Sequence, residues 1–443
     1  MLKKLRAKFP RRSVAYARAR ALVSRHPLPP GDLVRLDVIE KNDRTFLLRR
    51  ATEVGPIFKA IAWDEFWVCI VGLELGRRLL REHADALRPV TLKLEPLFPK
   101  GFLRQMQGED HRRYRKALQR AIRGEDLAAN RRGLDAIAAD ALARYATQPR
   151  AAEDSAADLI RTLNAIASGM LIQIFFGAQF GTPQFERVLA GYHRLGPYGL
   201  VWNLGPQQHA AFAEIRDFLL AEFGGAATSH PPGAEASILG QLVREGTLDA
   251  TLLGNLIYMV EMGRYDTYSL FRWLVKYAAD HPTLLDAIAH EDASKVPPTG
   301  RRSLAEAFVI ETLRMDQSER LIRVAQRDLV FEGWLIPKHA TVRICLWEPH
   351  KSPATFPEPF RFDPARFLAE KDPGADQFAP FGLDAHQCPF GDLAIGLSVI
   401  FLRALARAYV PASLGDGLPV KGAFHWEPAS RFGVKLEPRP PIT

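Results

Sequence analysis

A cysteine ahead of a predicted helix is the residue of this sequence with the clearest chemical potential. The stretch FAPFGLDAHQCPFGDLAIG, Phe378 to Gly396, carries aromatic, Gly and Pro residues before a helix expected to begin near Gly391. There Cys388 would meet the positive end of the helix dipole, which favours thiolate over thiol. A thiolate ligates a soft metal or attacks as a nucleophile. A lone cysteine is more often a small buried hydrophobe, so the rest of the chain has to decide.

Two helical pairs accompany this cysteine. Glu311 and Arg314 lie three residues apart, and each can reach the other on one helix face. His111 and Arg115 lie four residues apart and share a face in the same way. Three further segments follow the first pair in order: RVAQRD (323–328), GWLIP (333–337) and FRFDPARF (360–367).

A polar interruption in an apolar helical run is the third feature. The stretch EMGRYDTYSLFRW, 261–273, places Arg264, Tyr265, Asp266 and Thr267 next to one another. Charged groups left unpaired in a core are costly, so these side chains need either partners or a function.

The elements that must position these residues are mostly helices. Apolar residues at three- and four-residue spacing predict helices over 60–94, 111–148, 155–177, 208–224, 249–280, 303–315 and 391–409. Strand-like segments are fewer: 44–51, 328–337, 340–347 and 432–438. The expected fold class is mainly α with small peripheral β-sheets, in one domain over 1–443. The Pro- and Gly-containing stretch 229–236 is interpreted as a surface loop within it.

Composition is that of an ordinary globular protein, with 443 residues, 47% hydrophobic and 25% charged. The three cysteines lack CxxC spacing, which indicates a reducing compartment, by default the cytoplasm. The net charge is +9, and residues 1–40 form a basic segment. This segment has no apolar core of a signal peptide, and no membrane span is predicted in the chain. A solvated helix is expected there, with contact to a membrane surface as the alternative.

Taken in order, these segments resemble the cytochrome P450 family of haem–thiolate enzymes over about residues 50–440. The family's Cys loop reads Phe-x-x-Gly-x-His/Arg-x-Cys-x-Gly, followed by Leu-Ala. This chain matches it in register at Phe381, His386, Cys388, Leu393 and Ala394. The resemblance implies haem b (iron protoporphyrin IX) between the long central helix and the helix after the Cys loop. It also implies Cys388 as the metal ligand, with Phe381 beside it; an axial thiolate favours O–O cleavage.

Further roles are implied by the same resemblance. Glu311, Arg314 and Arg366 would form a buried network that supports the Cys loop. Cationic or donor side chains would grip the haem propionates through charge-assisted hydrogen bonds. The side chains that match these positions are His111, Arg115, Arg323 and His386.

Two residues of the Cys loop depart from the family pattern. Asp384 and Phe390 both stand where the family usually has Gly, which allows a tight turn and close approach to the porphyrin. Asp tolerates left-handed backbone better than most residues, so the first departure is compatible with the loop. For the second, Gly391 is expected to take over the close approach and to shift the loop slightly.

On the family's central helix, a small-Gly-x-acid-Thr-Thr pattern helps deliver protons for O–O cleavage. Two alignments compete here. Anchored on Gly263, Tyr265 takes the acid slot and Asp266 the Thr slot; anchored on chemistry, Asp266 and Thr267 form the acid–alcohol pair. One residue turns a side chain by about 100°, so the catalytic candidates are Tyr265, Asp266 and Thr267. We favour the alignment on Gly263; a π-bulge would reconcile the two.

A basic stripe lies on the helix that holds His111. Arg112, Lys116 and Arg120 follow at four-residue intervals, with Arg113 and Arg123 nearby. In the family this helix borders the face where an electron donor docks, and such a stripe would attract an acidic ferredoxin or flavodoxin. A solvated helix face is the alternative, and nucleic-acid binding is not expected.

The leading interpretation is a monooxygenase in a biosynthetic pathway, with electrons from a separate ferredoxin and reductase. Segments 87–106, 192–202 and 317–322 are expected to contact substrate, and their apolar content indicates a hydrophobic or amphipathic small molecule. Because the central helix is altered, a haem–thiolate enzyme with other chemistry is the first alternative: peroxide use, isomerisation, dehydration or nitrogen transfer. A catalytically silent haem-binding sensor is the second.

Overall fold

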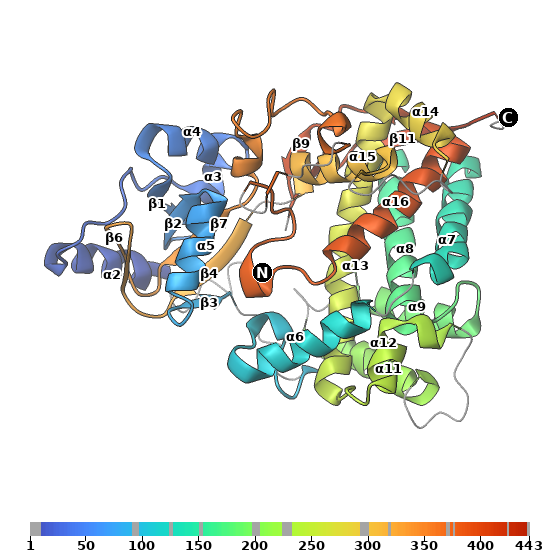
Figure 1. The fold of residues 1–443 in the computed structure, drawn as a ribbon, viewed down its shortest axis with the longest axis horizontal. Helices are drawn as coiled ribbons and strands as arrows, with labels where there is room; N and C mark the ends of the chain where they lie inside the picture. The colour runs from blue at the N-terminus through green and yellow to red at the C-terminus, as the bar shows by residue number, and fades with distance from the viewer. Residues whose placement is uncertain are drawn as a thin grey trace.

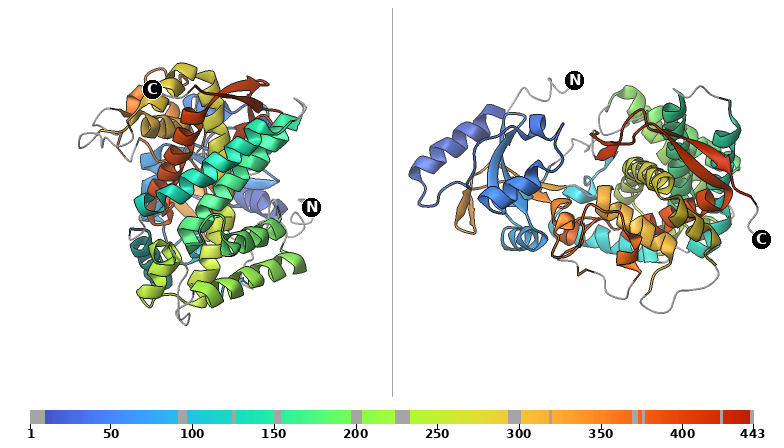
Figure 2. Two further views of the ribbon diagram at one scale, coloured as in Figure 1. Left: turned by 90° about the vertical axis from the view of Figure 1, so that its right-hand side faces the viewer. Right: turned by 90° about the horizontal axis from the view of Figure 1, so that it is seen from above.

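The structure is a computed structural model that describes residues 10–90, 97–123, 127–149, 154–196, 204–223, 233–292, 301–317, 320–368, 373–374, 377–422 and 425–440. Figure 1 places the main sheet, with helices α2 to α5 beside it, on one side of the molecule and the larger helical part on the other. The views in Figure 2 show the long helix α13 running through that helical part.

Helices make up most of the described chain, as the sequence predicts. Those of the helical part are α6 (Gly108–Arg123), α7 (Leu127–Thr147), α8 (Ser155–Phe176), α9 (Pro183–Leu195), α11 (Pro206–Phe223), α12 (Ile238–Arg244), α13 (Ala250–Asp280), α14 (Pro282–His290), α15 (Leu304–Thr312) and α16 (Gly391–Ala408). Those near the main sheet are α2 (Pro10–Val23), α3 (Leu36–Ile39), α4 (Phe46–Val54) and α5 (Leu73–Glu82).

The main sheet has five strands in the order β1-β2-β7-β4-β3, in which the β2–β7 pair is parallel and the others are antiparallel. Its strands are β1 (Ile57–Ala62), β2 (Glu65–Val71), β3 (Leu87–Pro89), β4 (Arg320–Ala325) and β7 (Thr341–Cys345). Three two-stranded sheets pair β5 (Leu329–Phe331) with β6 (Trp334–Ile336), β8 (Tyr409–Leu414) with β11 (Gly433–Pro438), and β9 (Pro419–Lys421) with β10 (Trp426–Pro428). The strands predicted over 328–337, 340–347 and 432–438 are therefore confirmed.

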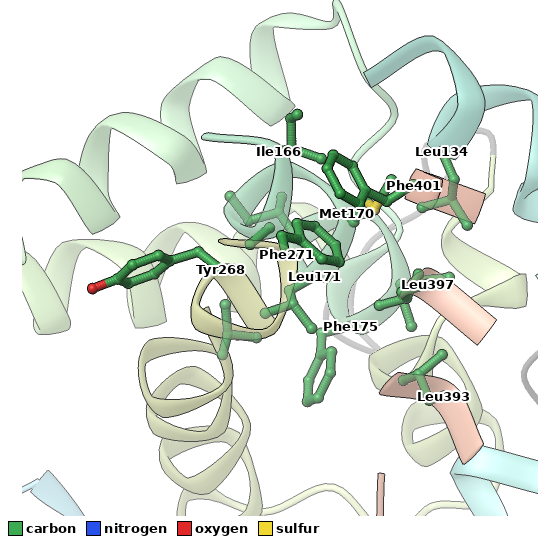
Figure 3. Close-up of a cluster of buried hydrophobic side chains, with 14 of the residues drawn as sticks. Leu134, Ile166, Met170, Leu171, Phe175, Tyr268, Phe271, Leu393, Leu397 and Phe401 are labelled. Atoms are coloured by element: carbon green, nitrogen blue, oxygen red, sulfur yellow. The ribbon is translucent and has the colours of Figure 1, made fainter. Parts of the chain in front are cut away.

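The largest core cluster gathers around α13 and α8. Phe271 of α13 stacks on Phe401 of α16, with ring centroids 4.2 Å apart, so the two helices that flank the Cys loop are joined by close packing. Of the helices that the structure describes, α8 has the length and apolar composition to cross a bilayer, and 72% of its apolar window is buried in this core. Figure 3 labels part of the cluster: Leu134, Ile166, Met170, Leu171, Phe175, Tyr268, Phe271, Leu393, Leu397 and Phe401.

The helix predicted over 60–94 is confirmed only at α5; the rest of 60–90 contains the end of β1, then β2 and β3, and 91–94 lie outside the described residues. The β1–β2 hairpin turns at Trp63 and Asp64, which have left-handed φ angles of 51° and 63°. The interior of β2 is buried on both faces, so its apolar residues do not alternate with polar ones. Such a run cannot be told from a helix by its period.

The reverse error occurs at 44–51, predicted as a strand, where the chain forms helix α4. Its residues FLLRRATEV are mostly good helix formers, and Leu47 is its fully buried residue, so one contact face suffices. The single helix predicted over 111–148 is two helices, α6 and α7, with 124–126 outside the described residues.

Candidate functional site

Two left-handed residues shape the loop before α16. Gly382 has a φ of 92° and Asp384 a φ of 66°, the second where the family pattern has Gly. The left-handed geometry expected of this Asp is thus present. The backbone N–H of Cys388 donates to the carbonyl of Phe381 at 2.9 Å, which closes the loop and sets the thiol just before the N-terminus of α16.

Phe390 is the second residue that departs from the family pattern, and the neighbouring Gly391 provides the close approach that the family's Gly would allow. Phe390 directly precedes α16 with a φ of −107°, a value open to any residue. A Cβ on Gly391 would lie 2.9 Å from the ring of Phe381, so glycine is required one position later than in the family pattern. The ring of Phe390 packs instead against Phe175 of α8, with centroids 4.8 Å apart.

The thiol of Cys388 is exposed, yet charged side chains from three other segments act on it. Desolvation by the surrounding protein raises its pKa to about 11, while the backbone N–H of Phe390 lowers it. The charge of Asp266 on α13 raises this pKa further, and that of Arg115 on α6 lowers it. The N-terminus of α16 lowers the pKa of the thiol as expected, but desolvation raises it by more. Binding of a metal cation would therefore have to displace the proton from the sulfur.

Of the four side chains predicted to bind propionates, Arg115 acts on this thiol, while His111 and Arg323 act on the fourth, His386, two residues before Cys388. The rings of His111 and His386 are 4.4 Å apart. Desolvation and then neighbouring positive charges lower the pKa of His386 to about 4 and that of Arg323 to about 10. The pKa values of His111 and Arg115 are also lowered, mainly by burial.

Arg104, in the short 3-10 turn Leu103–Gln105, is a fifth cation that the sequence reasoning missed. Its charge contributes to the lowered pKa values of His386 and Arg323 and also acts on Cys388. No family motif covers this position. The sequence indicated a role for this residue only in that an Arg lies within 87–106, a segment expected to contact substrate.

The backbone around Arg104 is held against the central helix. Asn255 of α13 accepts a hydrogen bond from the N–H of Leu103 at 2.7 Å and donates one to the carbonyl of Gly101 at 3.2 Å. The ring of Phe102 packs on Tyr258 of α13, with centroids 4.7 Å apart. These contacts fix the start of the Arg104 side chain beside α13.

These side chains fit the cofactor that the resemblance implies. The cations lower one another's pKa values, which indicates a site arranged for an anionic group. A haem set against Cys388 brings two propionates, and these would offset the repulsion through charge-assisted hydrogen bonds. The donor set therefore combines a sulfur ligand for iron with cations for the carboxylates.

The central helix is α-helical from Ala250 to Asp280, so the π-bulge that would merge the two alignments is not formed along this fully described helix. Of the three catalytic candidates, Tyr265 and Thr267 are buried, whereas Asp266 is exposed. The hydroxyl of Tyr265 accepts from Arg264 at 3.2 Å and donates to the carbonyl of Gly196 at 3.4 Å, next to the end of α9.

Asp266 is the candidate that faces the thiol. Its carboxylate lies close enough to Cys388 to raise the pKa of the thiol. Met262 and Gly263, four and three residues earlier and thus on the same helix face, are also partly exposed. In the alignment on Gly263, Asp266 occupies the Thr slot; which of the three candidates acts in catalysis stays a prediction.

Arg264 pairs within its own helix. Its guanidinium lies 3.0 Å from the carboxylate of Glu261, and it also donates to the carbonyl of Gly196 at 2.7 Å. Glu261 and Arg264 are both buried, and they form a buried ion pair. Because the two charges pair with each other, most of the free-energy cost of burying an unpaired charge is avoided.

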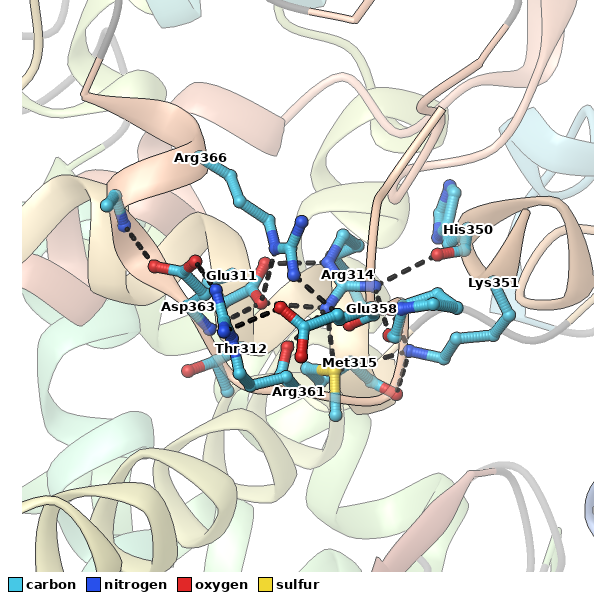
Figure 4. A network of polar contacts seen from close by, with 12 residues as sticks. Glu311, Thr312, Arg314, Met315, His350, Lys351, Glu358, Arg361, Asp363 and Arg366 are labelled. Atoms are coloured by element: carbon cyan, nitrogen blue, oxygen red, sulfur yellow. Dashed lines mark hydrogen bonds and ion pairs between the residues drawn. The ribbon is translucent and has the colours of Figure 1, made fainter. Parts of the chain in front are cut away.

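The Glu311–Arg314 pair is the centre of a buried network, shown in Figure 4. The guanidinium of Arg314 donates two hydrogen bonds to Glu311, at 2.6 and 2.7 Å, and both side chains are fully buried. Arg314 also donates to the carbonyls of His350 and Pro359 at 3.0 and 2.7 Å. Glu311 accepts from the N–H of Asp363 at 2.8 Å. The pair thus ties α15 to the 348–363 segment upstream of the Cys loop.

Two more cations complete this network. Arg366, the predicted third partner, lies 3.7 Å from the carboxylate of Glu311 and donates to the carbonyl of Glu358 at 3.1 Å. Lys351, which the sequence reasoning did not single out, is fully buried. It donates to the carbonyls of Arg314 and Met315 at 3.1 and 3.2 Å, where the chain forms the π-helical turn Leu313–Gln317.

The predicted basic stripe lies on the exposed side of α6. Arg112, Arg113, Lys116 and Arg120 are all exposed, and Arg120 forms an ion pair with Glu245 at 3.0 Å. Parts of the predicted substrate segments, 91–96, 197–202 and 318–319, lie outside the described residues.

Comparison with known proteins agrees with this geometry. The family model for cytochrome P450 matches residues 265–407. Abscisic acid 8'-hydroxylase 1 of Oryza sativa subsp. japonica is 28% identical over 412 residues, which covers 86% of this chain and 85% of the relative. Abscisic acid 8'-hydroxylase 1 of Arabidopsis thaliana is 25% identical over 433 residues, covering 89% and 88%.

Solved structures share the fold at lower identity. The retinoic acid-bound cyanobacterial CYP120A1 superposes with a TM-score of 0.69 at 20% identity, covering 94% of this chain and all of that one. Cytochrome P450EX alpha (CYP152N1) with myristic acid gives a TM-score of 0.65 at 14% identity, covering 93% and 99%.

Proposed function

We propose that the chain is a haem monooxygenase of the cytochrome P450 family that hydroxylates an apolar small molecule carrying a carboxylate, and the family match and the relatives support this. Cys388 would hold the haem iron, and His111, Arg115, Arg323 and His386 its propionates. When bound, the haem supplies the oxidising chemistry. The observation that carries the proposal is that Cys388, just before α16, is acted on by the charges of Asp266 on the central helix and of Arg115 and Arg104.

The proposal that the substrate carries a carboxylate is based on Arg104. Its charge acts on Tyr258 of α13 and on His386, one of the side chains predicted to bind a propionate. The surrounding aromatic rings of Phe98, Phe102 and Tyr258 give an apolar wall. Relatives and neighbours whose printed names include abscisic, retinoic and myristic acids support the same substrate class.

Replacing Arg104 tests the substrate class. In Arg104→Gln, an apolar carboxylic acid should bind about 10- to 100-fold more weakly, because a hydrogen-bonded charge pair is lost. The methyl ester of the same acid should bind equally to variant and native protein. Both affinities are measured from the change that ligands cause in the haem absorption spectrum.

Lys100→Gln is the matched control, since Lys100 is on the same segment but pairs with Asp110 at 3.7 Å. It should leave both affinities unchanged. If Arg104→Gln lowers haem content while the affinity for the acid is retained, Arg104 binds a propionate and the assignment to substrate is wrong.

Electrons are proposed to come from a separate acidic ferredoxin or flavodoxin that docks on the stripe of α6. A double charge reversal, Arg112→Glu with Lys116→Glu, should slow reduction by such a donor about 10-fold at low salt, because electrostatic steering is lost. The native rate should fall steeply with ionic strength, and the rate of the variant should not. Stopped-flow reduction measures both.

A second double reversal, Arg431→Glu with Lys435→Glu, makes the same charge change at exposed positions near and on β11. Equal slowing in both variants would show that net charge, not the stripe, controls reduction. We place the reaction in the cytoplasm and in a biosynthetic pathway, consistent with cysteines that lack disulfide spacing. Fractionation of the producing cells and the metabolites lost on deletion test these two points.

A further inference from the structure

We propose that Asp266 and His425 form an acid–base pair that delivers protons to the haem face of the central helix, with His425 recharging Asp266. His425 Nε2 lies 2.7 Å from Asp266 Oδ1, a distance typical of a strong hydrogen bond between charged groups. The two residues are 159 positions apart in the chain. The inference rests on haem at Cys388 and not on the substrate proposed above.

The segment that carries His425 is fastened to α13 by other contacts. Arg272 pairs with Glu427 at 2.8 Å and donates to the carbonyl of Pro428 at 2.9 Å. The indole N–H of Trp273 donates to the carbonyl of Trp426 at 3.0 Å. These contacts hold β10 on the helix one to two turns beyond Asp266, so the His425 side chain is positioned without depending on its own hydrogen bond.

In a proton relay, the residue that gives the proton is the more exposed one and its partner lies behind it, and the two side chains follow this order. Asp266 is 55% exposed, so its carboxylate is open to the space beside α13, and its charge acts on the thiol of Cys388. His425 is 22% exposed and lies behind it. Imidazole is the side chain whose ordinary pKa allows it to take and give protons near neutral pH. Asp266 is therefore the donor at the site, and His425 is the residue that returns its proton.

An alkyl hydroperoxide isolates the proton step without a native substrate. In heterolysis, the O–O bond would break with both electrons on the departing alcohol oxygen, which then needs one proton. The terminal O–H of the hydroperoxide supplies it: Asp266 would take this proton, share it with His425 through their hydrogen bond and return it to the alcohol oxygen, so no net proton is taken up. The second oxygen atom would be left at the haem site and removed as water by an added organic reductant that supplies two electrons and two protons. In homolysis the bond divides evenly and no proton is needed.

The experiment uses cumyl hydroperoxide with the full-length haem protein. Heterolysis gives 2-phenyl-2-propanol and homolysis gives acetophenone. Native protein should give mainly the alcohol, and Asp266→Asn should lose about 100-fold in the rate of heterolysis, the lower range for a general acid. His425→Gln keeps a hydrogen-bond donor but cannot relay a proton, and it should shift the ratio in the same direction. Asp266→Glu should recover part of the alcohol yield.

Two measurements distinguish a proton relay from a hydrogen bond that only holds the two segments together. The ¹⁵N chemical shifts of the His425 ring should move in Asp266→Asn, and the infrared stretch of carbon monoxide bound to the reduced protein should shift in both variants. A native product ratio in His425→Gln would overturn the relay, as would a loss of heterolysis found only in Thr267→Ala. Every variant should keep the native thiolate–carbon monoxide spectrum; its loss would point to failed haem binding instead.

Discussion

Cys388→Ser should abolish the spectrum of a thiolate-ligated haem when the reduced protein binds carbon monoxide. The hydroxyl of serine is a hard, weakly acidic ligand and does not donate the electron density that an axial thiolate does. Oxidation of substrate with dioxygen should fall to the background of free haem for the same reason. The loop itself should persist, because it is closed by the backbone hydrogen bond from residue 388 to Phe381 at 2.9 Å and by the Gly391–Phe381 contact.

Cys69→Ala is the matched control for this prediction. Cys69 is fully buried in β2, where burial raises the pKa of its thiol to about 12, so it is an inert core residue. Its replacement should leave the carbon monoxide spectrum unchanged while lowering stability slightly. A native spectrum in Cys388→Ser, or a lost spectrum in Cys69→Ala, would contradict the assignment of the ligand.

Local patterns were enough to find the Cys loop and the Glu311–Arg314 pair, because each is defined by spacing within a few residues. The central helix was harder. Tyr265, Asp266 and Thr267 differ by one position each, and only the packing of α13 determines which of them faces the thiol. That packing depends on segments far away in the chain, such as Gly196 beside Tyr265.

The other gaps have the same physical origin. His425 meets Asp266 through tertiary structure alone, and nothing next to it in the sequence indicates a partner 159 residues away. Arg104 belongs to no motif, and the residues on which its charge acts come from three other segments: α13, β4 and the Cys loop. The strand β2 was read as helix because burial on both faces removes the alternation that marks a strand. Sequence periods report local burial, whereas these features depend on which segments meet.

Arg314→Met should have the largest effect on folding. It leaves Glu311 fully buried without its bidentate partner and removes donors from the carbonyls of His350 and Pro359. Breaking a buried pair by removing one partner costs about 3–5 kcal/mol, so the urea midpoint should fall and the haem content with it. The two losses are coupled because the pair holds the segment that leads into the Cys loop.

Arg361→Met makes the same change of side chain beside the network, but at an exposed arginine that pairs with Glu358 and Asp363 on the surface. Surface pairs contribute little, so the unfolding free energy of this variant should stay close to that of the native protein. Adding Glu311→Leu to Arg314→Met removes the unpaired buried charge and should restore part of the stability, because an apolar pair can replace a buried ion pair. If the double variant is less stable than Arg314→Met alone, the buried carboxylate of Glu311 does not account for the loss. The hydrogen bond from Asp363 to Glu311 would then contribute more than the charge pair.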